Sequence, residues 1–204
     1  MRLTREERRQ QTRGDLLAAA RSVFLERGFH GASLEEISRE AGYTKGAVQS
    51  NWESKDELFL AVFDEFSALR VRSYVEAVLG GDTFDEGVRN SARLAWSGAR
   101  EEPGWTALLV EFWTHVSRRE PLRHAMSERH ERAMEAIAGV IEELAARHGL
   151  EFTLPAREVA RGSAALLRGL ELERTLDPEA GDAAQFEEMW TAFVSGLVRE
   201  RGVS

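Results

Sequence analysis

Two very short predicted helices joined by a glycine-containing turn are the feature of this sequence that most restricts its fold. Apolar spacing and Ser/Thr-x-x-Glu capping patterns predict these helices at 34–41 and 45–52, with Gly42 in the turn between them. A longer helix precedes them; its apolar stripe includes Leu16, Ala20 and Phe24, and Gly28 ends it. Two short helices joined by a three- or four-residue turn form a helix-turn-helix.

Helical periodicity continues through the rest of the chain. One helix is expected from Ser54 to near Gly80, and Gly or Pro bounds each later one, at 84–100, 103–118, 121–148, 155–176 and 182–201. No alternating run is long enough to predict a strand. The expected fold is therefore all-α, with about nine helices. A three-helix head (residues 1–55) is expected to carry the helix-turn-helix, and a larger helical-bundle body (residues 56–204) to follow it.

The net charge of −8 is unevenly distributed between these two parts. The head carries ten basic and eight acidic residues, whereas the body carries 17 and 27, so the head is at +2 and the body at −10. Both lysines of the chain, Lys45 and Lys55, lie in the head. Codon bias toward Arg is an alternative reason for so few lysines. A mildly basic head can hold phosphate while an acidic body stays away from it.

Several classes of function are disfavoured by what the sequence lacks. Without cysteine there is no disulfide framework, thiolate metal site or cysteine nucleophile. No apolar stretch approaches the roughly 20 residues needed to span a membrane, so we expect a soluble cytoplasmic protein. No Glu-x-x-His, Gly-x-Ser-x-Gly or Gly-x-Gly-x-x-Gly occurs, so no metal, cofactor or enzymatic activity is expected. A small helical enzyme that uses Glu and His groups of the body, or a protein-interaction bundle, remains the alternative.

The second short helix is expected to present an unusual outer face. Thr44 is placed to cap it and Val48 to anchor it, which leaves Lys45, Gly46, Gln49 and Asn51 on the outside. Lys can reach guanine or phosphate, Gln can pair with adenine, and Gly lets the backbone approach closely. The pattern indicates a helix for the DNA major groove; a solvated helical hairpin is the alternative.

The segment from Phe24 to Val48, together with the following Trp52-Glu-Ser-Lys-Asp-Glu-Leu-Phe59, resembles the DNA-binding domain of the TetR family of transcriptional regulators. The similarity extends from about Leu16 to Val62. It implies a homodimeric regulator with a DNA-binding head and an effector-binding body. The resulting expectation is a repressor that binds a palindromic operator and is released by a small apolar or aromatic effector.

The resemblance also implies roles for particular head residues. Ser33 would contact phosphate, Thr44, Lys45 and Gly46 would meet bases and phosphates, and Lys55 would grip phosphate at a helix N-terminus. The basic N-terminal extension would reach flanking phosphate or the minor groove with Arg5, Arg8, Arg9 and Arg13. The sequence departs from the family where Gln49 replaces a usual Tyr and Asn51-Trp52 replaces His-Phe. Gln49 is therefore a candidate reader of adenine, and Trp52 is expected in the core.

The body offers two sets of candidate residues. A pocket for the effector is expected among aromatic and Met side chains at helical spacing, although plain core is the alternative; the candidates are Trp96, Phe112, Trp113, Met126 and His130. Apolar stripes on the last two helices predict a homodimer interface, with burial inside one chain as the alternative; the candidates are Leu166, Leu167, Leu170, Trp190, Phe193, Val194 and Leu197.

Overall fold

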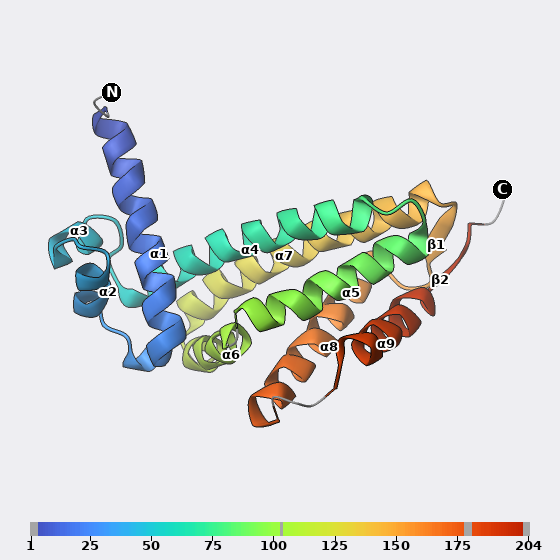
Figure 1. Cartoon of the computed structure of the whole chain (residues 1–204). Helices are drawn as coiled ribbons and strands as arrows, with labels where there is room; N and C mark the ends of the chain where they lie inside the picture. The colour runs from blue at the N-terminus through green and yellow to red at the C-terminus, as the bar shows by residue number, and fades with distance from the viewer. Residues whose placement is uncertain (1–3, 103, 178–180, 202–204) are drawn as a thin grey trace. The chain divides into compact units, whose positions relative to one another are not determined.

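The structure is a computed structural model that describes residues 4–102, 104–177 and 181–201. Nine helices and two three-residue strands account for the regular structure in these ranges, which confirms the all-α prediction (Figure 1). The helices are α1 (Arg5–Gly31), α2 (Leu34–Glu40), α3 (Lys45–Gln49), α4 (Lys55–Leu79), α5 (Phe84–Glu101), α6 (Trp105–Val116), α7 (Glu120–Arg147), α8 (Ala156–Leu176) and α9 (Ala183–Ser195). Among the described residues, no helix combines the length and the hydropathy that a membrane-spanning segment needs.

The helix starts follow the local capping signals. Thr4 and Ser33 form complete capping boxes with Glu7 and Glu36 at the starts of α1 and α2. The hydroxyl of Thr83 accepts the N–H of Glu86 at the start of α5 in the same way. Each cap satisfies a backbone N–H group that has no partner within the helix, so a side chain three residues away is enough to set the boundary.

The chain divides into two compact units. The first contains the described residues up to Phe66 together with Ala107–Met126, and the second contains Ser67–Thr106 and the described residues from Ser127 onward. The core of the first unit is a group of stacked and edge-on phenylalanine rings. Phe59 lies 4.0 Å from Phe112 and 5.3 Å from Phe24 between ring centroids, and Phe29 lies 4.9 Å from Phe112. Side chains from α1, α4 and α6 therefore bury one another.

The core of the second unit joins α5 and α9 with the ends of α4 and α7. Its largest buried rings are Phe84, Phe186 and Trp190. The indole N–H of Trp190 donates to the hydroxyl of Ser91 at 2.9 Å, so the one polar atom of this ring is satisfied inside the core.

Two short strands were not predicted, and one of them replaces the end of a predicted helix. The last helix ends at Ser195 rather than continuing to 201, because residues 198–200 form β2 (Val198–Glu200). This strand pairs antiparallel with β1 (Leu150–Phe152), so that Leu150 faces Glu200 and Phe152 faces Val198. Strands of three residues depend on a partner far away in the chain, and this dependence explains why periodicity did not predict them.

Candidate nucleic-acid interface

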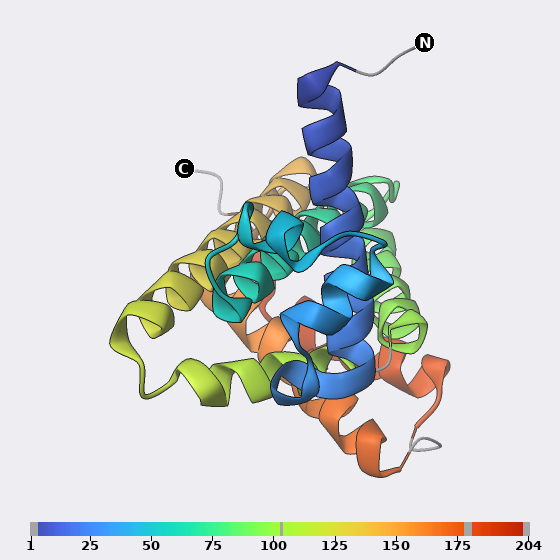
Figure 2. The ribbon, with the colours of Figure 1, turned by 90° about the vertical axis from the view of Figure 1, so that its left-hand side faces the viewer.

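The helix-turn-helix consists of α2, a turn and α3, and it packs beside α1 in the first unit (Figure 2). Gly42 lies in the turn with a φ of 74°, a left-handed conformation that favours glycine, and no atom would lie within 4 Å of an added Cβ. Thr44 caps α3 by accepting the N–H of Ala47, and Val48 is fully buried. The turn and the cap are therefore as predicted. Within α3, Val48 is the one side chain buried against the head.

The outer face of α3 presents Lys45, Gly46 and Gln49, all three exposed as predicted. An added Cβ at Gly46 would meet nothing closer than the Thr44 hydroxyl at 3.7 Å, so no packing requirement explains the glycine. The absence of a side chain instead leaves the backbone at the start of α3 accessible to a ligand. The ammonium group of Lys45 forms an ion pair with Glu35 of α2.

Asn51 and Ser33 are engaged in local structure. The Asn51 side-chain amide donates to the carbonyl of Ala47 at 2.9 Å, which satisfies a carbonyl at the end of α3. The Ser33 hydroxyl donates to Glu36 at 2.9 Å and accepts that residue's N–H at 3.2 Å. In this state Asn51 contributes to the helix end rather than to the outer face, which differs from the prediction.

Lys55 is engaged with the end of α1 in this structure. Its ammonium group donates to the carbonyl oxygens of Phe29 at 2.7 Å, Ala32 at 2.8 Å and His30 at 3.4 Å, and it lies 4.6 Å from the Phe29 ring centroid. These contacts use all three donors of an ammonium group. Burial lowers the pKa of Lys55. In this structure Lys55 ties the start of α4 to the end of α1, and its three donors do not face solvent phosphate.

The N-terminal arginines differ in how firmly they are held. Arg5 and Arg9 are exposed on the first turns of α1. The Arg13 guanidinium lies over the ring of Trp52, 4.5 Å from the centroid, and Trp52 itself is 2% exposed. Trp52 therefore closes the small core as predicted, and a stacked guanidinium keeps its edge donors available for phosphate.

The junction of α1 with α6 was missed by the sequence analysis. Gly28 has a φ of 72° and a ψ of 171°, which interrupts the helical backbone of α1. Beyond it, the N–H groups of Phe29 and His30 donate to the Glu111 carboxylate of α6 at 3.0 and 2.8 Å. One turn further along α6, His115 lies 2.6 Å from Asp56 of α4. At this end of α1, the Glu111 carboxylate thus accepts backbone N–H groups and the Lys55 ammonium group donates to backbone carbonyls.

The predicted effector residues do not gather in one compact unit. Phe112, Trp113 and Met126 belong to the first unit, and Trp96 and His130 belong to the second. Phe112 is fully buried between other phenylalanine rings and Met126 is 3% exposed, so both side chains lie in the core of this structure.

Trp96 and His130 remain half-buried in the second unit. The Arg174 guanidinium stacks on Trp96, 4.3 Å from the ring centroid. Burial, with smaller contributions from Arg168 and Arg161, lowers the pKa of His130 to about 4, so this side chain is neutral near pH 7. Within the second unit, Trp96 thus has a cation on its ring, and His130 is a neutral imidazole near two arginines.

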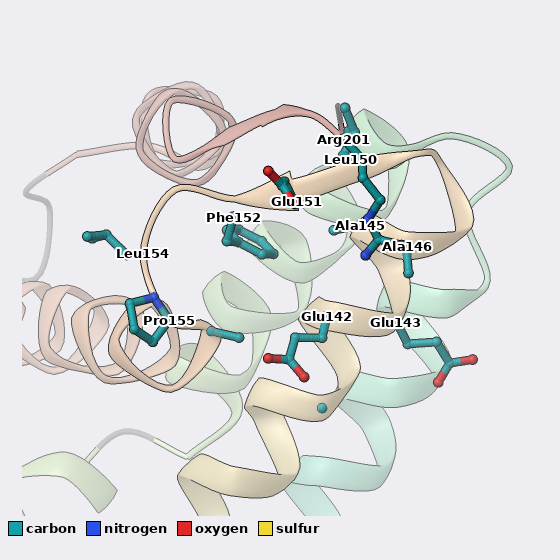
Figure 3. A pocket seen from close by; sticks show the side chains of 12 residues that line it. Glu142, Glu143, Ala145, Ala146, Leu150, Glu151, Phe152, Leu154, Pro155 and Arg201 are labelled. Atoms are coloured by element: carbon teal, nitrogen blue, oxygen red, sulfur yellow. The ribbon is translucent and has the colours of Figure 1, made fainter. Parts of the chain in front are cut away.

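A groove of about 500 Å³ lies in the second unit, where the end of α7 faces β1 (Figure 3). Its apolar part includes Leu150, Phe152 and Leu154, and charged side chains at its edge include Glu142 and Glu143. Periodicity did not reveal this groove because its lining depends on β1, which the sequence pattern did not predict.

The predicted interface residues of α8 and α9 fall into two groups. Trp190 and Val194 are 4% and 7% exposed within one chain, so their burial needs no second copy. Leu166, Leu167, Leu170, Phe193 and Leu197 are only partly buried. On the outer sides of the same helices, Leu176 is 89% exposed and Met189 is 37% exposed.

Comparisons with known proteins agree with this geometry. Residues 16–62 match the family described as "Bacterial regulatory proteins, tetR family", and residues 84–199 match "BetI-type transcriptional repressor, C-terminal". The transcriptional activator FasR of Mycolicibacterium smegmatis is 48% identical over 61 residues, which make up 30% of this chain and 26% of FasR. The regulator UidR of Escherichia coli is 29% identical over 132 residues, or 63% of this chain and 64% of UidR. The chain thus matches from about a quarter to somewhat under two thirds of these relatives.

A solved structure of a regulator from Mesorhizobium loti, assigned to the TetR family, is similar with a TM-score of 0.74. It is 22% identical, with 95% of this chain and 96% of that chain covered, so it shows the shared fold. NemR of Escherichia coli in its reduced form is similar with a TM-score of 0.71 at 22% identity, with 94% and 100% covered. With both the helix-turn-helix and more than half of the chain matched, this protein belongs to the TetR family of bacterial transcriptional regulators.

Proposed function

We propose that the protein is a non-catalytic, homodimeric repressor that binds a palindromic operator and is released by a small apolar or aromatic effector. Residues 1–55 serve as the DNA-binding part, and residues 56–204 bind the effector and dimerise. The observation that carries this proposal is the exposed Lys45, Gly46 and Gln49 face on a short, firmly capped α3. Such a face offers base-edge donors and close backbone approach but has no role in packing.

Binding to the operator is tested by selecting duplexes from random DNA with the full-length protein and footprinting those it retains. A two-fold symmetric dimer should protect two half-sites whose centres are about 34 Å apart along the duplex. Gln49→Ala should relax the preference at one position in each half-site, since a Gln amide pairs with adenine. Uniform weakening across all sequences would show that Gln49 contacts only the DNA backbone. Absence of selection and protection would contradict operator binding.

The sign of regulation needs a separate measurement, because the relatives include both kinds of regulator. One matching family is described as a repressor and FasR is described as an activator. A reporter gene placed behind the selected operator should be transcribed less when the protein is present. Increased transcription would show that the protein is an activator, and the proposal that it binds an operator would still stand.

The proposed dimer interface lies on the outer sides of α8 and α9. Support comes from small and apolar residues that are exposed in one chain, including Ala165 and Gly169 on α8 and Met189 and Ala192 on α9. An added Cβ at Gly169 would meet no atom within 4 Å, so Gly169→Glu fits within one chain but would place two carboxylates in the interface. Sedimentation should show that this variant is monomeric.

Gly139→Glu is the matched control for the interface. Gly139 is exposed on α7, and its added Cβ would also meet no atom within 4 Å. This variant makes the same substitution in another helix and should remain dimeric. If both variants sediment as the wild type does, the interface lies elsewhere.

Effector binding is tested by release from the operator. Apolar and aromatic compounds are added one at a time to the labelled operator complex, and those that dissociate it are tested again with Trp96→Ala. We expect this variant to bind operator normally and to need more compound for release, because Trp96 is half-buried in the second unit beside Arg174. Unchanged release would remove Trp96 from the proposed pocket.

A further inference from the structure

One ion pair links the two helices of the helix-turn-helix on their exposed side. The carboxylate of Glu35 in α2 contacts the ammonium group of Lys45 at the start of α3, and the two side chains remain 61% and 48% exposed. Neither residue packs into the core of the head. Lys55, the other lysine of the chain, already donates to three backbone carbonyls. Lys45 is therefore the one lysine whose ammonium group can reach DNA without releasing the end of α1.

Glu35 affects the two kinds of DNA contact differently. An ammonium group has three donors, so Lys45 can keep one hydrogen bond to Glu35 and still donate to O6 and N7 of a guanine. A phosphate bound at the same ammonium group would lie close to the Glu35 carboxylate, and the two anions repel each other. The carboxylate thus permits a base contact but opposes a backbone contact.

We propose that Glu35 is a specificity-determining residue, which reserves Lys45 for a base edge in the major groove and weakens binding to non-operator DNA. The inference rests on the proposed function, because it requires that α2 and α3 face DNA. Neutralisation of Lys45 has a large effect in this head because the net charge of residues 1–55 is only +2. One cation therefore contributes a large share of the attraction to phosphate.

The central variant is Glu35→Gln in the full-length protein. Fluorescence anisotropy measures its binding to a selected operator duplex and to a scrambled duplex between 50 and 200 mM salt. We expect affinity for the scrambled duplex to rise about three-fold, the usual scale for an exposed ion pair. The slope of log K against log salt should steepen by about one, because one more cation contacts phosphate. Operator affinity should change less, so the ratio of the two affinities falls.

Glu40→Gln is the matched control. Glu40 is exposed in the last turn of the same helix and has no bond to Lys45, so this variant makes the same charge change without releasing the lysine. The ratio of operator to scrambled affinity should stay at the wild-type value. An equal fall of the ratio in both variants would overturn the inference, because the effect would then come from net charge alone.

A second cycle uses Lys45→Met. In this background Glu35→Gln should no longer change the salt slope for the scrambled duplex, because no ammonium group remains to be released. Persistence of the change would show that Glu35 acts without Lys45 and would also overturn the inference. If wild-type protein binds neither duplex, the proposed function fails as well; if it binds and only these variant effects are missing, the inference alone fails.

Discussion

Replacing Gly28 by Ala tests the junction between α1 and α6, because this glycine meets two separate requirements. Its φ of 72° and ψ of 171° lie in a region that is essentially restricted to glycine. An added Cβ would also lie 2.8 Å from the Glu111 Oε2 atom, so the carboxylate would have to move away. Its movement would break the bonds from the N–H groups of Phe29 and His30.

The magnitude follows from these two effects. Backbone strain at Gly28 should destabilise the fold by about 2 kcal/mol. Loss of the Glu111 bonds should remove about 2 kcal/mol more; most of this comes from the half-buried Phe29 N–H, because water can replace the partner of the exposed His30 N–H. Gly28→Ala should therefore lower the free energy of unfolding by about 4 kcal/mol, which corresponds to a fall of roughly 10 °C in Tm for a chain of this length.

Urea unfolding of a double-mutant cycle with Glu111→Ala separates the two effects. In the Glu111→Ala background, Gly28→Ala should cost only about 2 kcal/mol, because no carboxylate remains to be displaced. Gly42→Ala is the control: its φ is 74° and its added Cβ would meet no atom, so strain alone should cost about 1–2 kcal/mol. Protein concentration is held constant because association shifts apparent stability. An equal cost of Gly28→Ala with and without Glu111 would refute the coupling of these residues.

Three further predictions concern contacts that bridge distant segments. Lys55→Met should lower the free energy of unfolding by about 1–2 kcal/mol by removing the donor to the end of α1; the salt slope of DNA binding should stay unchanged, and a flatter slope would restore Lys55 as a phosphate contact. Trp190→Phe should cost about 2 kcal/mol in urea unfolding because it removes the bond to Ser91 and leaves a smaller buried ring; a loss below about 0.5 kcal/mol would contradict this account. His130→Gln should flatten the dependence of Tm on acid pH: the unfolded wild type takes up a proton near pH 6.5 and the folded protein only near pH 4, so stability is lost as pH falls through that window. Parallel profiles for wild type and variant would argue against a lowered pKa of His130.

Features that depend on residues close together in the chain were predictable. Capping involves side chains three residues apart, so Thr4, Ser33 and Thr44 marked the starts of α1, α2 and α3 correctly. The positive φ of Gly42 follows from the sharpness of the turn that it occupies. The exposed side of α3 also followed, since helical periodicity places Gly46 nearly opposite the buried Val48.

The choice of partner for a polar side chain was not predictable in the same way. Lys55 and Glu111 carry charges that suit phosphate and solvent equally well, and their acceptors and donors at the end of α1 lie more than 20 residues away. The pairing of β1 with β2 likewise joins residues about 50 positions apart, where an apolar pattern alone continued a helix.

By itself, the sequence determined the all-α class, the helix-turn-helix and the outward side chains of α3, because helix formation and capping are local. Only the tertiary structure decided which charged groups are already engaged. In the folded chain, Lys55 donates to backbone carbonyls, Glu111 accepts backbone N–H groups, and Lys45 forms an ion pair with Glu35. The tertiary structure also buried Phe112 and Trp190 within one chain. These outcomes depend on which segments meet when the apolar faces are buried, and no local pattern specifies that meeting.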